Sequence, residues 1–161
     1  MAVVVWIVEG TWTACVDAAR DRPPGDGRTV LVHITSPDTA AAARGAYASL
    51  LGRARPGHDP ADRLERLAAV SADDLLDRAA RRLARPCDRV ERTGRAEREV
   101  VAEAEGAELL VCARDGDRSR LGPRSLGPAT RFVVDHAPCP VLLVWPGSPP
   151  SPADLPPPPP H

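Results

Sequence analysis

The sequence predicts a single α/β domain, a doubly wound parallel sheet of five strands with helices on both faces. Short apolar runs rich in β-branched residues or leucine alternate along the chain with segments of helical periodicity, which is typical of β-α-β units. The apolar runs are continuous rather than alternating, as strands buried on both faces require. The 161 residues of the chain suffice for one compact core.

The first three elements follow from the amino-terminal segment. Val3 to Val8 is the first expected strand, and a helix from Thr13 to Arg20 follows it. We expect that helix to end before Pro23, because proline lacks the N–H that helical hydrogen bonding needs. The β-branched run from Thr29 to Ile34 is the second expected strand.

The middle of the chain has helical periodicity. Apolar residues recur at helical spacing between Ala43 and Leu51, which predicts a short helix closed by Gly52. From Pro60 to Leu83, leucine and alanine side chains fall on one face. A capping box at Ser71 and Asp74 could restart the helix, so the pattern fits either one long helix or two.

The second half supplies the remaining elements. The segment from Cys87 to Arg92 is mostly polar, so as a strand it belongs at a sheet edge. A helix from Ala96 to Glu105 ends at a glycine, and the apolar strand from Glu108 to Cys112 follows. The last pair is a helix from Pro128 to His136, with proline at its first position, and a strand from Val141 to Trp145.

The chain therefore divides into a domain at residues 1–146 and a proline-rich, flexible tail at residues 147–161. Nine of the nineteen prolines lie from residue 146 onward, and such a segment cannot pack a core. We expect a polyproline II extension there, a conformation that partner proteins bind in grooves lined by aromatic side chains.

Composition excludes several functional classes. The 21 basic and 22 acidic residues nearly cancel, which argues against a nucleic-acid or membrane partner. Because all basic residues are arginine, mechanisms that need a lysine, such as P-loop phosphate binding, are excluded. The four cysteines form no CxxC pair, which favours reduced thiols and a cytoplasmic location. The apolar amino-terminal run is too short for a signal peptide or a membrane span.

The segment ARDGDRSRLGPRSLGPAT, residues 113–130, has the composition of an anion-binding loop. It combines three glycines and four arginines with the start of a helix, and each of these features favours phosphate. In doubly wound folds ligands bind beyond the carboxyl ends of the strands, where the strand order reverses. The alternative is a solvated loop whose arginines pair with Asp115 and Asp117.

The segment from Gly106 to Val144, which ends in HAPCPVLLV, resembles the C-terminal signature of the universal stress protein family. Weaker similarity covers the rest of the domain, including Glu9-Gly10-Thr11 where the family favours Asp-Gly-Ser/Thr. The resemblance implies a Rossmann-like fold of the adenine nucleotide alpha hydrolase type, with strand order 3-2-1-4-5. It also implies a homodimer, which we place at the last strand, because that strand is apolar and lies at a sheet edge in this order.

In the ATP-binding members of this family, a Gly-x2-Gly-x9-Gly-(Ser/Thr) loop holds the phosphates and ribose. Adenine lies near the end of the second strand, and the acidic residue after the first strand faces the nucleotide. The resemblance therefore implies a set of candidate contacts to ATP, ADP or AMP: Glu9, Gly10, Thr11, Ile34, Ala113, Gly116 and Gly127. Arg118 and Arg120 are added as candidates because loop arginines can replace donors that the motif has lost.

The phosphate motif itself is degenerate in this chain. With Gly127 as the third glycine, strict spacing puts Arg114 and Asp117 at the first two glycine positions. A shift by one residue recovers Gly116 but leaves ten intervening residues instead of nine. Pro128 stands at the Ser/Thr position, and proline has neither the N–H nor the hydroxyl that would contact phosphate.

These observations lead to three functional hypotheses. The first is a homodimeric binding or signalling module in the stress response that binds ATP or another adenine nucleotide weakly through residues 113–128. The second is a member that binds no nucleotide and acts as a protein-interaction module through its proline-rich tail. The third is a slow ATPase, although no nucleophile, general base and orienting group converge in the sequence. No catalytic residue and no structural metal site are predicted.

Overall fold

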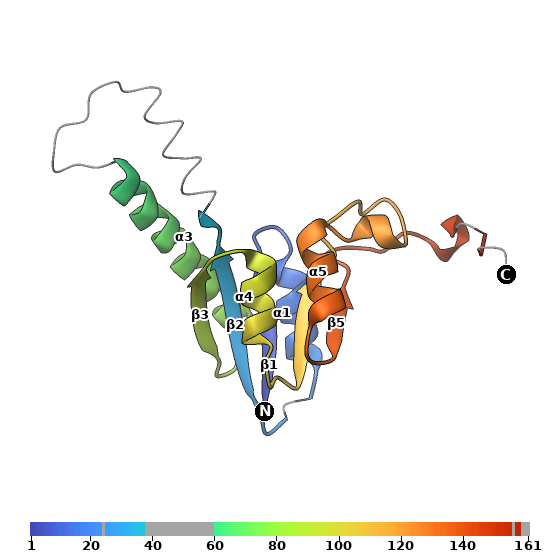
Figure 1. The fold of residues 1–161 in the computed structure, drawn as a ribbon. Helices are drawn as coiled ribbons and strands as arrows, with labels where there is room; N and C mark the ends of the chain where they lie inside the picture. Colours follow the sequence, from blue (N-terminus) through green and yellow to red (C-terminus); the bar gives the residue numbers. More distant parts are fainter. Residues whose placement is uncertain (24, 38–59, 156, 159–161) are drawn as a thin grey trace.

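Five parallel strands form the central sheet in the order β3-β2-β1-β4-β5 (Figure 1). The strands are β1 (Ala2–Trp6), β2 (Arg28–Thr35), β3 (Asp88–Thr93), β4 (Leu109–Ala113) and β5 (Val141–Val144). This computed structural model describes residues 1–23, 25–37, 60–155 and 157–158. The parallel pairing of all neighbouring strands and their order confirm the predicted fold class.

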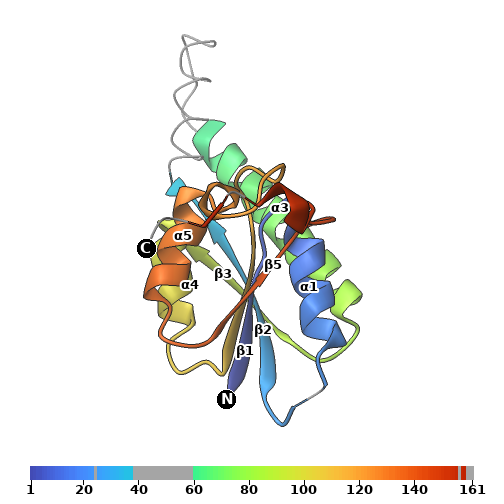
Figure 2. The same ribbon diagram turned by 90° about the vertical axis from the view of Figure 1, so that its right-hand side faces the viewer.

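In the part of the chain that the structure describes, two helices cover each face of the sheet (Figure 2). The described helices are α1 (Trp12–Asp21), α3 (Pro60–Leu83), α4 (Ala96–Glu103) and α5 (Pro128–His136), with short 3-10 turns η1 (Pro123–Ser125) and η2 (Pro152–Asp154). Helices α1 and α3 lie on one face, and α4 and α5 on the other. Residues 60–83 form one continuous helix, so no break occurs at the predicted capping box. The predicted short helix from Ala43 to Leu51 lies outside the described residues.

The core consists of two apolar clusters, one on each side of the sheet. Consecutive strand residues point to opposite faces, so Val5 packs beneath α1 and α3 whereas Val4 packs beneath α4 and α5. The residues of β4 are all buried, which explains the continuous apolar run in its sequence. Strand β3 is polar and mostly exposed at the edge beside β2, as the sequence predicted.

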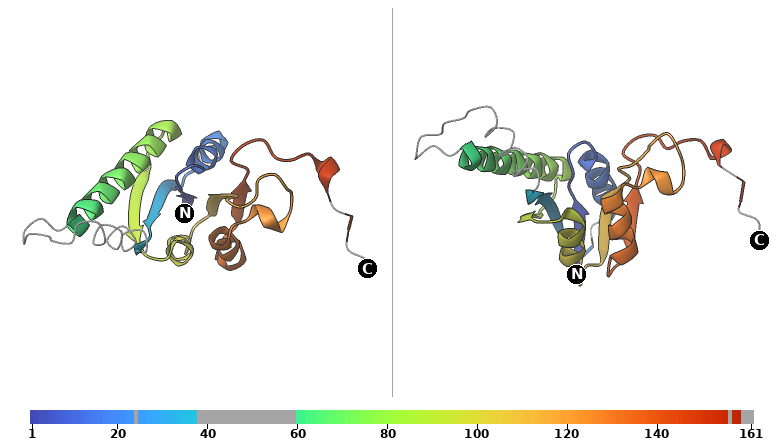
Figure 3. Two further views of the ribbon diagram at one scale, coloured as in Figure 1. Left: turned by 90° about the horizontal axis from the view of Figure 1, so that it is seen from above. Right: turned by 45° about the horizontal axis from the view of Figure 1, so that its top comes forward.

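The strand order reverses at the middle of the sheet. The chain runs from β1 outward to β2 and β3, and then crosses to β4 and β5 on the other side of β1. The order therefore reverses between β1 and β4, which is the position where ligands bind in doubly wound sheets. Figure 3 shows the fold from above, with the helical layers on either side of the sheet.

The apolar run at the amino terminus extends further than the strand that it forms. Strand β1 ends at Trp6, two residues before the expected Val8. The Val8 carbonyl instead accepts hydrogen bonds from the N–H groups of Thr11 and Trp12, at 3.1 and 2.9 Å. Val8 therefore belongs to the turn that begins α1.

Candidate functional site

The turn between β1 and α1 places an acidic residue at the carboxyl end of the sheet. Gly10 has a φ of 84°, a left-handed conformation that favours glycine, and it lets the chain turn sharply after β1. Thr11 is buried, and its N–H is held by the Val8 carbonyl, so the turn is fixed at its base. Glu9 is exposed beside it. The predicted contacts Glu9, Gly10 and Thr11 thus lie together.

The ends of β2 and β4 lie on either side of this turn. Ile34 is buried in the core on the α4 and α5 side of the sheet, with 8% of its surface exposed. His33 Nδ1 donates a hydrogen bond to the Ile7 carbonyl at 2.8 Å, which ties the ends of β1 and β2 together. On the other side of β1, the predicted residue Ala113 ends β4 and is also buried. Ile34 and Ala113 are therefore core residues near the carboxyl ends of β2 and β4.

The loop between β4 and α5 folds back and bonds to itself. The Gly116 N–H donates to the Ser125 carbonyl at 3.0 Å, and the Asp117 N–H donates to the Arg124 carbonyl at 2.8 Å. A Cβ atom on Gly116 would lie 2.4 Å from the Arg124 carbonyl oxygen. The absence of a side chain at Gly116 is therefore required for this closure, and its N–H is already bonded within the loop.

Arg114 joins the loop to the end of β5. Its guanidinium donates to the Ser125 hydroxyl and lies 4.8 Å from the centroid of the Trp145 ring, a cation–π contact. The Ser125 hydroxyl in turn donates to the Gly122 carbonyl at 2.6 Å, and Ser125 is fully buried. Sequence reasoning did not identify Ser125 or Trp145, because their contacts depend on how the loop closes.

An acidic side chain occupies the start of α5. The Gly127 N–H donates to Asp115 Oδ1 at 2.7 Å. A Cβ atom on Gly127 would lie 2.8 Å from Asp115 Oδ1 and 2.9 Å from Oδ2, so the carboxylate rests directly on the glycine. Helix α5 begins at the next residue, Pro128. The sequence suggested Asp115 as an ion-pair partner of arginines, and the structure places it at the positive end of a helix.

The two predicted arginine contacts are solvated. Arg118 and Arg120 are exposed in the middle of the loop. Beside them, Asp117 accepts hydrogen bonds from the Ser119 hydroxyl and N–H, and these bonds lower its pKa below the ordinary value of 3.8. Arg120 adds a smaller charge effect in the same direction on that pKa. Because both arginines are exposed, solvent and salt screen their charges.

The predicted contacts therefore fall into two groups. Glu9, Gly10 and Thr11 follow β1, while Ile34 and Ala113 end the adjacent strands β2 and β4, so these five share one edge of the sheet. The other four lie in the loop before α5: Gly116, Arg118, Arg120 and Gly127.

The thiol of Cys112, near the end of β4, has a pKa raised to about 12, first by burial and then by the negative charge of Asp115. Within the described ranges, no three His, Cys, Asp or Glu residues are grouped to hold a metal ion.

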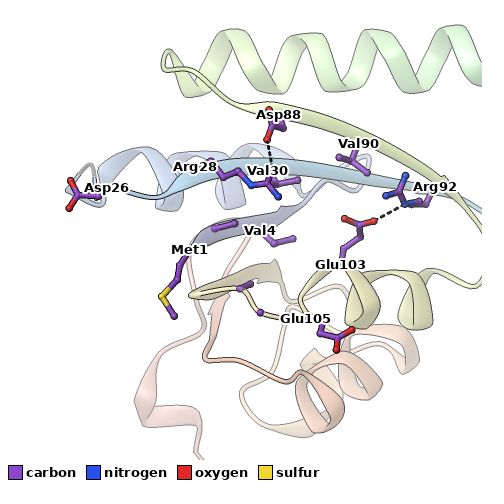
Figure 4. Close-up of a pocket in the computed structure, with 13 residues that line it drawn as sticks. Met1, Val4, Asp26, Arg28, Val30, Asp88, Val90, Arg92, Glu103 and Glu105 are labelled. Atoms are coloured by element: carbon purple, nitrogen blue, oxygen red, sulfur yellow. Dashed lines mark hydrogen bonds and ion pairs between the residues drawn. The ribbon is translucent and has the colours of Figure 1, made fainter.

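A separate cavity of about 640 Å³ lies at the opposite end of the sheet (Figure 4). It is lined by the first halves of β1 and β2, by β3 from Asp88 to Arg92 and by residues around the end of α4. Two ion pairs line its walls, Arg28 with Asp88 at 3.2 Å and Arg92 with Glu103 at 2.6 Å. Because it lies at the amino ends of the strands, this cavity is distinct from the crevice that the strand order predicts.

Comparison with known proteins identifies the family. The family model described as the universal stress protein family matches residues 15–144. No curated protein matches the chain significantly. Within the described residues, the helices are too short or too polar to cross a membrane.

Solved structures share the fold. The universal stress protein UspA from Lactobacillus plantarum is 18% identical, with a TM-score of 0.60 over 89% of this chain and 97% of that one. A universal stress protein in complex with cAMP is 20% identical, with a TM-score of 0.53 over 91% and 98% of the two chains. A family protein from Arabidopsis thaliana with AMP bound is 17% identical, with a TM-score of 0.53 over 90% of each chain.

Proposed function

Because this chain belongs to the universal stress protein family, we propose that it is a non-catalytic binding module of the stress response that holds an adenine ligand in the crevice beyond β1 and β4. Two structures of the same fold are described with cAMP and with AMP bound. In this chain the contact that carries the proposal is the one between Asp115 and Gly127. The contact shows that the start of α5 attracts a negatively charged oxygen, the electrostatic property that a phosphate site uses, and it also places a carboxylate where a phosphate would enter.

Adenine nucleotides should bind this crevice weakly. Pro128 occupies the first position of α5 and supplies neither an N–H nor a hydroxyl. Two missing hydrogen bonds to a charged group, at about 1.5 kcal/mol or more each, weaken binding at least about a hundredfold relative to the intact motif. We therefore expect an ATP dissociation constant of roughly tens of micromolar or above.

Calorimetry with ATP tests this proposal on the native chain, on Pro128→Ser and on Pro128→Ala. Serine restores both donors, whereas alanine restores only the N–H, so affinity should increase from proline to alanine to serine. This placement of the phosphates would be contradicted if the native chain bound ATP with submicromolar affinity and Pro128→Ser left that affinity unchanged. Chromatography of the small molecules released by denaturing freshly purified protein provides an independent check for a bound adenine compound.

A homodimer through β5 is part of the same proposal. Strand β5 lies at the edge of the sheet, and its four residues are each only half-buried. The Pro140 and Val144 carbonyls accept hydrogen bonds from Leu110 and Arg114, so the even-numbered residues pair with β4. The groups of Val141 and Leu143 therefore face the open edge, where a second copy can pair with them.

A protein-interaction role is a second candidate, and the backbone of the tail favours it. Ser151 has φ and ψ of −64° and 139°, and Leu155 has −63° and 131°, which are polyproline II values. Leu155 is 59% exposed, so the proline-rich tail presents a large apolar side chain to solvent. Loss of a co-purifying partner upon removal of residues 148–161 tests this role.

A further inference from the structure

The loop before α5 already uses the backbone donors that a phosphate would need. Gly116 donates to Ser125, Asp117 donates to Arg124, and Gly127 donates to Asp115. In a glycine-rich anion loop, N–H groups of this kind point at the ligand instead. A phosphate could therefore reach these donors only by breaking hydrogen bonds within the loop.

Asp115 is the decisive member of this network, because it carries the same charge as the ligand group that it would meet. Its carboxylate lies on Gly127, with both oxygens within 2.9 Å of where a Cβ atom would stand. An anion at that position already compensates the partial positive charge of α5. A phosphate brought to the same place must either displace the carboxylate or lie beside a like charge.

The loop arginines do not reverse this preference. The guanidinium of Arg114 is held by the Ser125 hydroxyl and by the Trp145 ring, so it is directed toward β5. Arg118, Arg120 and Arg124 are exposed, where solvent and salt weaken their attraction for an anion.

We propose that the Asp115 carboxylate takes the place of a ligand phosphate at the start of α5, so that the crevice selects adenine nucleosides over adenine nucleotides. This inference rests on the proposed adenine site and specifies its ligand class. An uncharged adenosine carries no group that competes with the Asp115 carboxylate for the start of α5, whereas a nucleotide phosphate that reaches Gly127 does. Asp115 is thus a specificity-determining residue for this crevice.

Calorimetry with adenosine, AMP and ATP tests the inference on the native chain, Asp115→Asn and Asp115→Ser. Both variants remove the charge and keep an oxygen that can accept from the Gly127 N–H. We expect the native chain to bind adenosine at least as tightly as ATP. Each variant should bind ATP about ten- to a hundredfold more tightly, with adenosine affinity unchanged, because one charged hydrogen-bonded competitor is removed. Agreement between the two variants, each with a native thermal midpoint, excludes an effect of misfolding.

Asp117→Asn is the matched control, since Asp117 lies in the same loop but bonds to Ser119 rather than to α5. An equal gain in ATP affinity from Asp117→Asn would overturn the inference, because it would reveal a general effect of loop charge. Tighter binding of ATP than of adenosine by the native chain, unchanged in Asp115→Asn, would overturn it as well and leave the proposed adenine site standing. Failure of all variants to bind adenosine, AMP or ATP would instead overturn the adenine site, and the inference with it.

Discussion

Replacement of Gly116 by alanine tests whether this glycine closes the loop or admits a ligand. An added Cβ atom would lie 2.4 Å from the Arg124 carbonyl oxygen and 2.9 Å from the carbonyl carbons of Ser125 and Leu126. All of these atoms belong to backbone, which cannot rotate away as a side chain can. The loop must therefore either tolerate the overlap or open.

Both responses to Gly116→Ala cost a similar free energy. Overpacking without rearrangement costs about 1–3 kcal/mol. Opening the loop instead loses the hydrogen bonds from Gly116 to Ser125 and from Asp117 to Arg124, about 0.5–1.5 kcal/mol each. A central value of about 2 kcal/mol lowers the thermal midpoint by about 4–8 °C in a domain of this length.

Thermal melting followed by circular dichroism measures this loss of stability in the native chain, in Gly116→Ala and in Gly147→Ala. Gly147 is the matched control, because a Cβ atom there meets no heavy atom within 4 Å. A Gly116→Ala midpoint within about 1 °C of the native value would refute the packing argument, since such a shift corresponds to well under 1 kcal/mol. Loss of adenosine affinity without loss of stability would assign Gly116 to ligand access instead.

Three further changes address the dimer, the tail and an ion pair between helices. Light scattering should give twice the 17.1 kDa chain mass for the native protein. The variant Leu143→Pro should be a monomer, because proline removes a backbone N–H at the open edge of β5. A monomeric native protein would contradict the β5 dimer. Removal of residues 148–161 should leave the thermal midpoint unchanged, and a fall of more than about 5 °C would show that the tail docks on the domain. The bond from Arg82 holds the pKa of Asp17 below 3.8, so Asp17→Asn should destabilise the protein at neutral pH. That difference should vanish as the pH falls through the folded-state pKa of Asp17, and a difference that persists in acid would refute the assignment.

The inner strands of the sheet could be predicted from sequence because they are largely buried on both faces. Leu109 to Ala113 is apolar at every position, and the structure buries every one of these residues. Helix α5 has the predicted bounds, since Pro128 fits only the first turn of a helix. The predicted end of β1 was wrong by two residues, because an apolar residue such as Val8 packs as well in a turn as in a strand.

The geometry of the loop could not be predicted from glycine spacing. The contact between Asp115 and Gly127 joins residues 12 positions apart, and it forms only when Gly116 brings the two ends of the loop together. Sequence patterns with a helical or strand period contain no such contact. Ser125 looked like an ordinary loop serine for the same reason, although it is fully buried. Whether the predicted residues of the crevice contact a ligand stays a prediction.

In the proposed site Pro128 and Asp115 act on the same phosphate position, so their effects on ATP binding should be coupled. Pro128→Ser alone restores two donors, but the carboxylate on Gly127 still repels the phosphate that would use them. Asp115→Asn alone removes that charge while the first helical residue still lacks its donors. The double variant should therefore bind ATP more tightly than the two single gains predict by addition, because residues that share one partner are not independent. Calorimetry on this double-mutant cycle measures the coupling, and strictly additive gains would mean that the carboxylate and the restored donors act at separate places.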